Sequence, residues 1–291
     1  MKILILCLIL SSLNYYKTSQ VKTVYVIPHS HDDVGWIRTI DSYYYGVDKD
    51  KKNVGVKYIL NSIYRELQLN EDFKFIYSEM AFFTKWWNEQ TSLTKENVKK
   101  LVKQRRLQFV GGGYVMNDEA TTYYSDIIDQ MTLGHEFIKN TFGVEAVPTI
   151  AWQIDPFGHS VSIPKYFEML LSQQNIIDFL WKSKVSNQSI ITHYLTEKYS
   201  QPSELDFFVK APIVDDPKSD LYNLDTKLEY FIKHCDLLLQ KTNLAKSPFP
   251  FGDDFKYENA NIIAENIIKL VKYGNEQFFT LFIECPPYDT D

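Results

Sequence analysis

Short apolar runs alternate along the chain with longer stretches in which apolar residues recur at helical spacing. Runs of about four to eight apolar residues between Gly, Pro or polar clusters predict strands, and apolar positions three or four apart predict helices. The predicted strands cover residues 24–27, 74–77, 107–110, 148–154, 176–181, 248–251 and 278–283. The predicted helices cover residues 54–67, 81–89, 95–104, 125–142, 164–172, 226–240 and 259–274. This alternation indicates an α/β domain with a mostly parallel sheet, either barrel-like or open.

Residues 1–20 have the outline of a secretory signal peptide. Lys2 precedes an apolar run at 3–10, and small polar residues follow it. The run is shorter than the about 20 residues of an ordinary membrane span, and no later segment is long and apolar enough to be one. We therefore expect a mature chain that begins near Gln20 or Val21 and enters the secretory route, with an uncleaved anchor as the alternative.

The composition of residues 21–291 suits one large α/β domain or two small ones, since 45% hydrophobic residues suffice for a substantial core. A net charge of -6 without a clustered basic face argues against binding to nucleic acid. Once Cys7 leaves with the signal peptide, only Cys235 and Cys285 could pair, so stability must come from packing. The sequon at 187–189 fits a glycosylated surface loop.

The first predicted strand runs directly into His-Ser-His-Asp-Asp-Val-Gly-Trp at 29–36. If the chain stays extended there, His29, His31 and Asp33 point to one side. Imidazole and carboxylate form an N/O donor set that suits Zn²⁺, and a catalytic zinc needs about three or four ligands with one position left for substrate. A lone His-x-His is often fortuitous, but its place at a strand end, in phase with Asp33, favours a metal site.

Two further predicted strands end in carboxylates. Asp155 follows the apolar run at 148–154, although Asp before Pro also caps turns. Asp253 and Asp254 follow the strand at 248–251, and adjacent carboxylates disfavour simultaneous ionisation, so one can hold a proton and act as a general acid. Alone, the pair could be a solvated turn. Together with Asp155, it supplies the ionised and the protonated carboxylate that glycoside cleavage requires.

Five blocks in this order closely resemble glycoside hydrolase family 38, the α-mannosidases, in particular the lysosomal type. They are His-Ser-His-Asp-Asp-Val-Gly-Trp at 29–36, Gly-Gly-Tyr-Val-Met-Asn-Asp-Glu-Ala at 112–120, Asp-Gln-Met-Thr-Leu-Gly at 129–134, Trp-Gln-Ile-Asp-Pro-Phe-Gly-His-Ser at 152–160 and Gly-Asp-Asp-Phe at 252–255. The resemblance covers nearly all of the mature chain. It implies the distorted parallel β/α barrel of that family's N-terminal catalytic domain.

The resemblance further implies a zinc-dependent retaining α-mannosidase that acts on terminal α-D-mannosyl residues of oligomannose or N-glycan substrates. Zn²⁺ would be bound by His31, Asp33 and Asp155, with mannose hydroxyls completing its coordination. Asp155 would also be the nucleophile that forms a covalent mannosyl-enzyme, and Asp254 would be the acid and base. The implied location is a lysosome-like compartment or the outside of the cell.

In the same pattern, Trp36 and Phe157 would form apolar walls of the sugar site, and Asp253 would contact the substrate. His29 is not a metal ligand in the family. It would instead be an outer neighbour that helps to hold the ligating side chains in position.

The chain also departs from the family pattern. The family has a fourth zinc ligand, a His, well beyond position 291, followed by helical and β-sandwich domains, so we expect an incomplete catalytic domain here. An Arg and a Tyr of the family are replaced by Lys182-Ser183-Lys184-Val185, and Lys cannot reproduce a bidentate guanidinium contact. Two alternatives to a mannosidase stay open. The missing ligand favours an inactive carbohydrate-binding remnant, and the His-x-His at the end of the first strand would suit a metal-dependent amidohydrolase in which both histidines bind metal.

Overall fold

The computed structural model describes residues 23–47, 54–158, 178–182, 189–195, 198–242, 246–276 and 280–284. The predicted signal peptide, the predicted helix at 164–172, Asn187 of the sequon and Cys285 lie outside these ranges. Within them, no helix combines the length and the apolar character that crossing a membrane requires.

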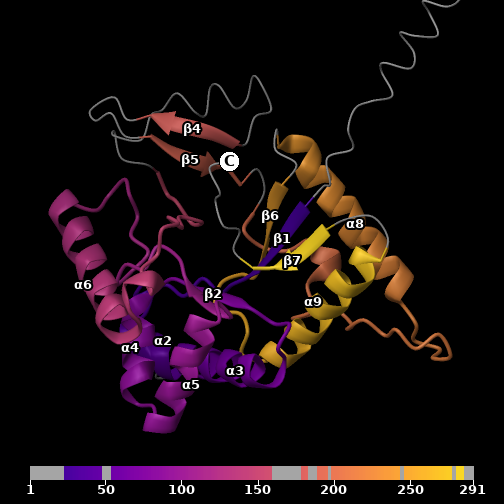
Figure 1. Ribbon diagram of the computed structural model, residues 1–291, viewed down its shortest axis with the longest axis horizontal. Helices are drawn as coiled ribbons and strands as arrows, with labels where there is room; N and C mark the ends of the chain where they lie inside the picture. The colour runs from indigo at the N-terminus through magenta and orange to yellow at the C-terminus, as the bar shows by residue number, and fades with distance from the viewer. Residues whose placement is uncertain are drawn as a thin grey trace, which may run out of the picture.

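A three-stranded parallel sheet forms the centre of the fold (Figure 1). Strand β1 (Thr23–Pro28) lies between β6 (Lys246–Phe251) and β7 (Thr280–Ile283) and pairs in parallel with both. Five of the six residues of β1 are buried. Both faces of the strand are covered: Val24 and Val26 belong to the main hydrophobic core, and Tyr25 and Ile27 pack in a second cluster with Ile76. Pro28 lies opposite Phe251, so the segments that follow β1 and β6 start next to each other.

Two smaller sheets accompany the central one. Strands β2 (Phe75–Tyr77) and β3 (Leu107–Phe109) pair in parallel, whereas β4 (Asp178–Lys182) and β5 (Ser189–His193) pair antiparallel. The parallel pairs confirm the predicted α/β class. Strand β5 was not predicted. The strands of the described ranges form three separate sheets, so the distorted barrel that the resemblance implies does not appear there as a closed ring.

The predicted strand at 148–154 is wrong, because this segment is irregular in the structure. Its carbonyl at Ile150 accepts a hydrogen bond of 2.8 Å from the N–H of Gly111, just beyond β3. The segment after β3 does not continue as a strand, because Gly111 and Gly112 have φ values of 62° and 74°. These values lie outside the extended range that strand pairing requires. Asp155 is therefore delivered by an irregular segment.

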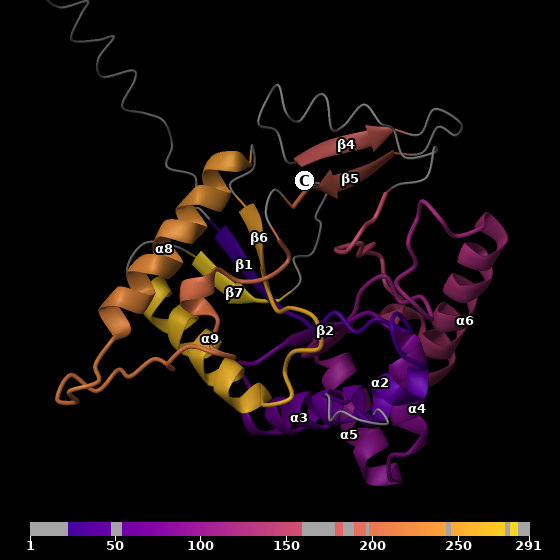
Figure 2. The same cartoon turned by 180° about the vertical axis from the view of Figure 1, so that it is seen from behind.

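Helices α8 (Leu224–Lys241) and α9 (Ala260–Asn275) pack on one side of the central sheet, α8 against β6 and α9 against β7 (Figures 1 and 2). Gly274 was predicted to end the second of these helices. It lies inside the last turn instead, and Glu276 is the C-cap residue. A Cβ at position 274 would overlap Leu281 of β7, so this glycine lets α9 approach the sheet closely.

The other helices gather around the smaller parallel sheet, away from the β4–β5 pair (Figure 1). They confirm the predictions at 54–67, 81–89, 95–104 and 125–142, and they add one short helix, α2, that was not predicted. Their bounds are α2 (Ile40–Tyr45), α3 (Val56–Leu69), α4 (Met80–Asn88), α5 (Ser92–Lys103) and α6 (Tyr124–Phe142), with the 3₁₀ turn η1 (Val144–Ala146) against α6. A second 3₁₀ turn, η2 (Ser203–Leu205), lies against α8.

Local capping explains why α2 forms despite its length. The side chain of Thr39 accepts a hydrogen bond from the N–H of Ser42, and Gly46 ends the helix in the left-handed conformation with a φ of 68°. An aromatic cluster connects the longer helices: the ring of Phe83 lies 5.6 Å from that of Trp86 and 6.0 Å from that of Phe142 on α6. Such packing supplies the apolar burial on which the fold depends.

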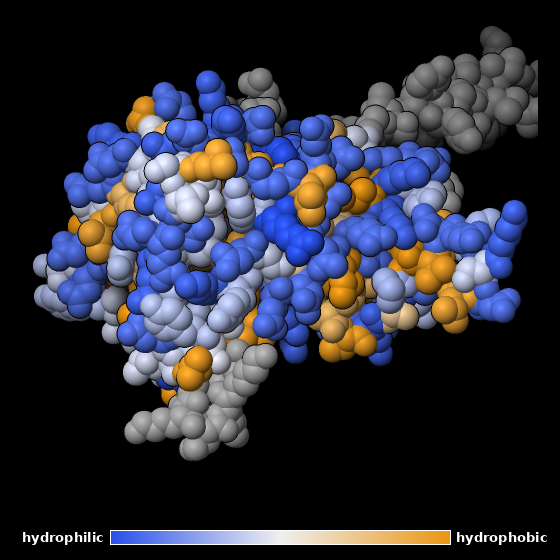
Figure 3. All heavy atoms as spheres, turned by 90° about the horizontal axis from the view of Figure 1, so that it is seen from below, coloured by the Kyte–Doolittle hydropathy of each residue, from blue (hydrophilic) through white to orange (hydrophobic). Residues whose placement is uncertain are grey.

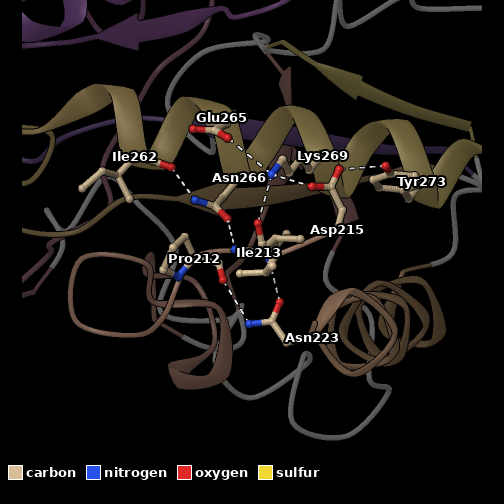
Figure 4. A network of polar contacts seen from close by, with 10 residues as sticks. Pro212, Ile213, Asp215, Asn223, Ile262, Glu265, Asn266, Lys269 and Tyr273 are labelled. Carbon is tan, nitrogen blue, oxygen red and sulfur yellow. Dashed lines mark hydrogen bonds and ion pairs between the residues drawn. The ribbon is translucent and has the colours of Figure 1, made fainter. Parts of the chain in front are cut away.

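A polar network fixes the loop before α8 to helix α9 (Figure 4). Nζ of Lys269 donates to Oδ1 of Asp215 at 2.9 Å and to the carbonyl of Ile213 at 3.0 Å. The hydroxyl of Tyr273 donates to Oδ2 of Asp215 at 2.8 Å, and Oδ1 of Asn266 accepts from the N–H of Ile213 at 2.6 Å. Because positions 266, 269 and 273 share one face of α9, they hold this loop along the helix.

Polar residues cover most of the face seen from below, and hydrophobic residues appear on it in separate patches (Figure 3). Among the most exposed large apolar side chains of the described residues are Trp36 and Phe157, which are 71% and 79% exposed. Both belong to the segments that carry the predicted site residues.

Candidate functional site

The chain stays beside β6 after β1 has ended. The N–H of His29 donates to the carbonyl of Phe251 at 3.2 Å, and the N–H of His31 donates to the carbonyl of Asp253 at 3.3 Å. His31 then pairs with Asp254 in an isolated parallel bridge. The segment predicted to bind metal and the segment predicted to hold the acid therefore lie side by side.

Gly252 makes this close approach possible. A Cβ at that position would overlap the backbone carbonyl of His29, so only glycine fits without displacing one of the two segments. Beyond it, Phe255 has a positive φ of 50°, which is uncommon for a residue with a side chain, and its ring stacks on that of Tyr43 with centroids 4.8 Å apart. The turn that carries Asp253 and Asp254 is thus fixed at both ends.

The three predicted metal ligands converge. Nε2 of His31 lies 3.3 Å from Oδ1 of Asp33 and 3.3 Å from Oδ2 of Asp155. One potential ligand atom from each residue lies within 4.8 Å of the others. His31 is buried, and its Nε2 has no hydrogen-bond partner among the described residues. One imidazole and two carboxylates in this arrangement could hold a divalent metal ion.

The other side of the His31 ring faces a buried carboxylate. Nδ1 of His31 lies 3.7 Å from Oε1 of Glu79, which is 1% exposed. Burial lowers the pKa of His31, but the neighbouring carboxylates of Asp33 and Glu79 outweigh burial and raise that pKa to about 11. A metal ion binds neutral imidazole and would have to displace a proton here, so binding should release protons. Glu79 escaped the sequence analysis because it lies in no motif identified there.

His29 lies outside the metal-ligating group. Its Nδ1 donates to the carbonyl of Ile27 at 3.1 Å, and its ring meets that of Trp152 edge to face at 5.5 Å. Burial lowers the pKa of His29 to about 4, so the ring is neutral. The described residues assemble a candidate metal group from His31, Asp33 and Asp155 without His29.

Asp32 is a second buried acid that the sequence analysis did not single out. Its two carboxylate oxygens accept hydrogen bonds from the hydroxyls of Ser30 at 2.8 Å and Tyr77 at 2.9 Å. Burial, together with the nearby carboxylate of Glu79, raises the pKa of Asp32 to about 7, although these hydrogen bonds oppose the shift. Asp32 thus joins the end of β1 to β2.

Tyr199 links the candidate metal group to Asp254. Its hydroxyl donates to Oδ1 of Asp254 at 2.6 Å, and its ring packs edge-on against that of His31 with centroids 5.7 Å apart. Burial and this hydrogen bond raise the pKa of Tyr199, and the charge of Asp155 adds to the effect, so the hydroxyl remains a donor. Sequence reasoning missed Tyr199, which lies in an irregular segment between short elements.

The predicted substrate contacts lie in the same segments. Oδ1 of Asp253 accepts a hydrogen bond of 3.0 Å from the N–H of Asp254, and Asp253 is half-buried. Trp36 and Phe157 follow Asp33 and Asp155 by three and two positions, and their exposure leaves both rings open to a ligand. Their roles in binding sugar stay predictions.

Comparisons with known proteins agree with these motifs. Residues 21–286 match the model of the glycosyl hydrolases family 38 N-terminal domain. The lysosomal α-mannosidase of Mus musculus is 39% identical over 278 residues, covering 87% of this chain and 27% of that protein. The lysosomal α-mannosidase of Dictyostelium discoideum is also 39% identical over 278 residues, covering 89% of this chain and 27% of that protein. The chain thus spans about a quarter of the length of these relatives.

A solved structure shows the same fold. The α-mannosidase from Enterococcus faecalis matches with a TM-score of 0.63 over 90% of this chain and 28% of its own, at 14% sequence identity.

Proposed function

This chain belongs to glycoside hydrolase family 38, and we propose that it is a zinc-dependent retaining α-mannosidase for terminal α-D-mannosyl residues of oligomannose glycans. The observation that carries the proposal is the convergence of His31, Asp33 and Asp155 next to the strand end that bears Asp254. We propose a lysosome-like compartment or secretion as its location, because relatives are named lysosomal α-mannosidases.

The donor set supports zinc as the metal. Ligand atoms at about 2.0–2.2 Å from a tetrahedral zinc lie about 3.3–3.6 Å from one another. The two separations of 3.3 Å from Nε2 of His31 fit that geometry. The buried Nε2 has no hydrogen-bond partner in the described part of the chain, so it is suited to a metal. When bound, zinc supplies positive charge that orients and polarises the substrate's hydroxyl groups.

The protein's own carboxylates carry the bond chemistry. Oδ2 of Asp155 faces His31, which leaves the other oxygen to attack the anomeric carbon. As that bond forms, the bond from the anomeric carbon to the leaving oxygen breaks, and Asp254 gives its proton to that oxygen. Asp254 then takes a proton from the water that displaces Asp155, and the mannose leaves with its original configuration. The hydrogen bond from Tyr199 orients Asp254 for both transfers.

The test is an assay of the full chain with an aryl α-mannoside at saturating zinc, beside Asp155→Ala and Asp216→Ala, an exposed aspartate in the loop before α8. Proton NMR of the first product gives the stereochemistry. We expect α-mannose first from the wild type and Asp216→Ala, and no turnover from Asp155→Ala. Release of β-mannose first would contradict retention. Binding of mannosides without turnover in all three would instead support the carbohydrate-binding alternative.

A further inference from the structure

The buried side chain of Glu79 is not used by the chemistry described so far. Glu79 follows β2 and is the N-cap residue of α4, yet its side chain makes no capping hydrogen bond. Both of its carboxylate oxygens are buried and have no hydrogen-bond partner among the described residues. Burying an ionised carboxylate in such a position costs free energy unless the carboxylate accepts a hydrogen bond from a nearby donor.

His31 offers the matching donor. Its Nδ1 is also buried without a partner among the described residues, and it faces Oε1 of Glu79 at 3.7 Å. This separation exceeds the about 3.2 Å limit of an N–H···O hydrogen bond, so the two groups are neighbours without a hydrogen bond between them. The opposite nitrogen, Nε2, faces Asp33 and Asp155.

The chemistry of imidazole assigns the proton. A neutral ring has one N–H and one bare nitrogen, and a metal ion needs the bare one. With Nε2 directed to the other metal ligands, the N–H must be at Nδ1, which lies 3.7 Å from the carboxylate of Glu79. Asp32 does not compete for this role, because both of its oxygens already accept hydrogen bonds from Ser30 and Tyr77.

We propose that Glu79 is the positioning residue of the metal site: it accepts the Nδ1 proton of His31 and thereby keeps Nε2 bare and directed at Asp33 and Asp155. This inference rests on the proposed zinc site. It assigns Glu79 an action through His31, without contact with substrate or metal.

Zinc affinity of the full chain tests the inference, measured by competition with a chromophoric chelator for wild type, Glu79→Gln and Glu66→Gln. Glu66 is a matched control, because it is also a buried glutamate, on α3, and accepts a hydrogen bond of 2.7 Å from Asn70. Loss of an outer partner of a ligating histidine typically weakens metal affinity about 10–100-fold, which we expect for Glu79→Gln. Glu66→Gln should bind like the wild type. Unchanged affinity in Glu79→Gln would overturn the inference.

Two further measurements separate positioning from a general structural role. In a His31→Ala background, Glu79→Gln should cause no additional loss of zinc affinity, and an additional loss would show that Glu79 does not act through His31. Nitrogen-15 NMR of the zinc-loaded wild type should show His31 protonated at Nδ1, with its signal assigned by loss in His31→Ala. An Nε2–H tautomer would overturn the inference even if Glu79→Gln failed to fold.

Zinc affinities of the same variants distinguish failure of the inference from failure of the proposed function. If His31→Ala binds zinc like the wild type, the proposed metal site itself is wrong. If His31→Ala loses zinc and Glu79→Gln does not, only the role of Glu79 is wrong.

Discussion

The hydroxyl of Tyr199 donates a hydrogen bond of 2.6 Å to Oδ1 of Asp254, so an irregular segment restrains the side chain proposed as the general acid. The same ring packs against His31, and the metal side and the acid side of the site therefore share one neighbour.

Tyr199→Phe should lower turnover of an aryl α-mannoside with a poor leaving group by about 10–100-fold, because a misoriented acid loses part of the 10²–10⁴-fold that general acid catalysis supplies. An activated leaving group needs little protonation, so its turnover should fall much less. Tyr222→Phe is the control, since the Tyr222 hydroxyl donates a similar bond of 2.9 Å to Asp225 at the surface. Equal losses for both substrates would count against an orienting role.

Asp33→Asn should lower zinc content sharply while the fold stays intact, because a neutral amide oxygen is a poorer donor than a carboxylate. Removing a residue that only contacts a metal ligand typically weakens metal affinity about 10–100-fold, and we expect a larger loss for Asp33→Asn, which alters a ligand itself. Elemental analysis after dialysis, with Asp41→Asn as the exposed control, measures it. Zinc content equal to that of the wild type would remove Asp33 from the ligand set.

Gly252→Ala should separate the ends of β1 and β6, because its Cβ would overlap the backbone of His29. We expect a stability loss of about 1–3 kcal/mol together with weaker zinc binding. Gly274→Ala meets the side chain of Leu281, which is not part of the candidate site, and should cost stability alone. Denaturant unfolding and zinc titration of both variants test this. Normal zinc affinity in a folded Gly252→Ala would show that the close approach is dispensable for the site.

Asp215→Asn should destabilise the protein in a pH-dependent way. Hydrogen bonds from Lys269 and then from Tyr273 hold the pKa of Asp215 below its ordinary value of 3.8. A depressed carboxyl pKa contributes stability that is present above the unfolded pKa and is lost as the pH falls through the folded pKa. The variant should therefore lose about 1 kcal/mol near neutral pH, and the difference should vanish in acid.

Denaturant unfolding of the wild type and Asp215→Asn, near neutral pH and in acid, checks this prediction. Asp220→Asn is an exposed control in the same loop. A difference between wild type and Asp215→Asn that persists unchanged in acid would show that the charge of Asp215 is not what stabilises the loop.

The residues of the candidate site could be named from the sequence where they fall within short motifs. His31 and Asp33 are two positions apart at the end of a strand, and the end of β6 was visible in the apolar run before Gly252. The alternation of elements also predicted the parallel sheets. Asp155 lies beside His31 as expected, but the predicted strand that should deliver it is wrong, because the irregular backbone after β3 decides its path.

The remaining neighbours could not be predicted, because tertiary packing alone brings them together. Tyr199 lies outside the motifs quoted, and Glu79 sits among the apolar residues of β2 and α4. Neither position shows from spacing that its side chain will face His31. Gly274 has the residue type of a helix end, yet the approach of β7 explains its presence.

The most direct test of the account is to trap the glycosyl-enzyme. The zinc-loaded full chain would be incubated with a fluorinated mannosyl fluoride, whose second fluorine slows hydrolysis of the covalent intermediate, and then digested and mapped by mass spectrometry. We predict one fluoromannosyl group on Asp155 and none in Asp155→Ala. A label on another carboxylate, or inverted mannose from an active chain that is never labelled, would contradict a retaining mechanism through Asp155.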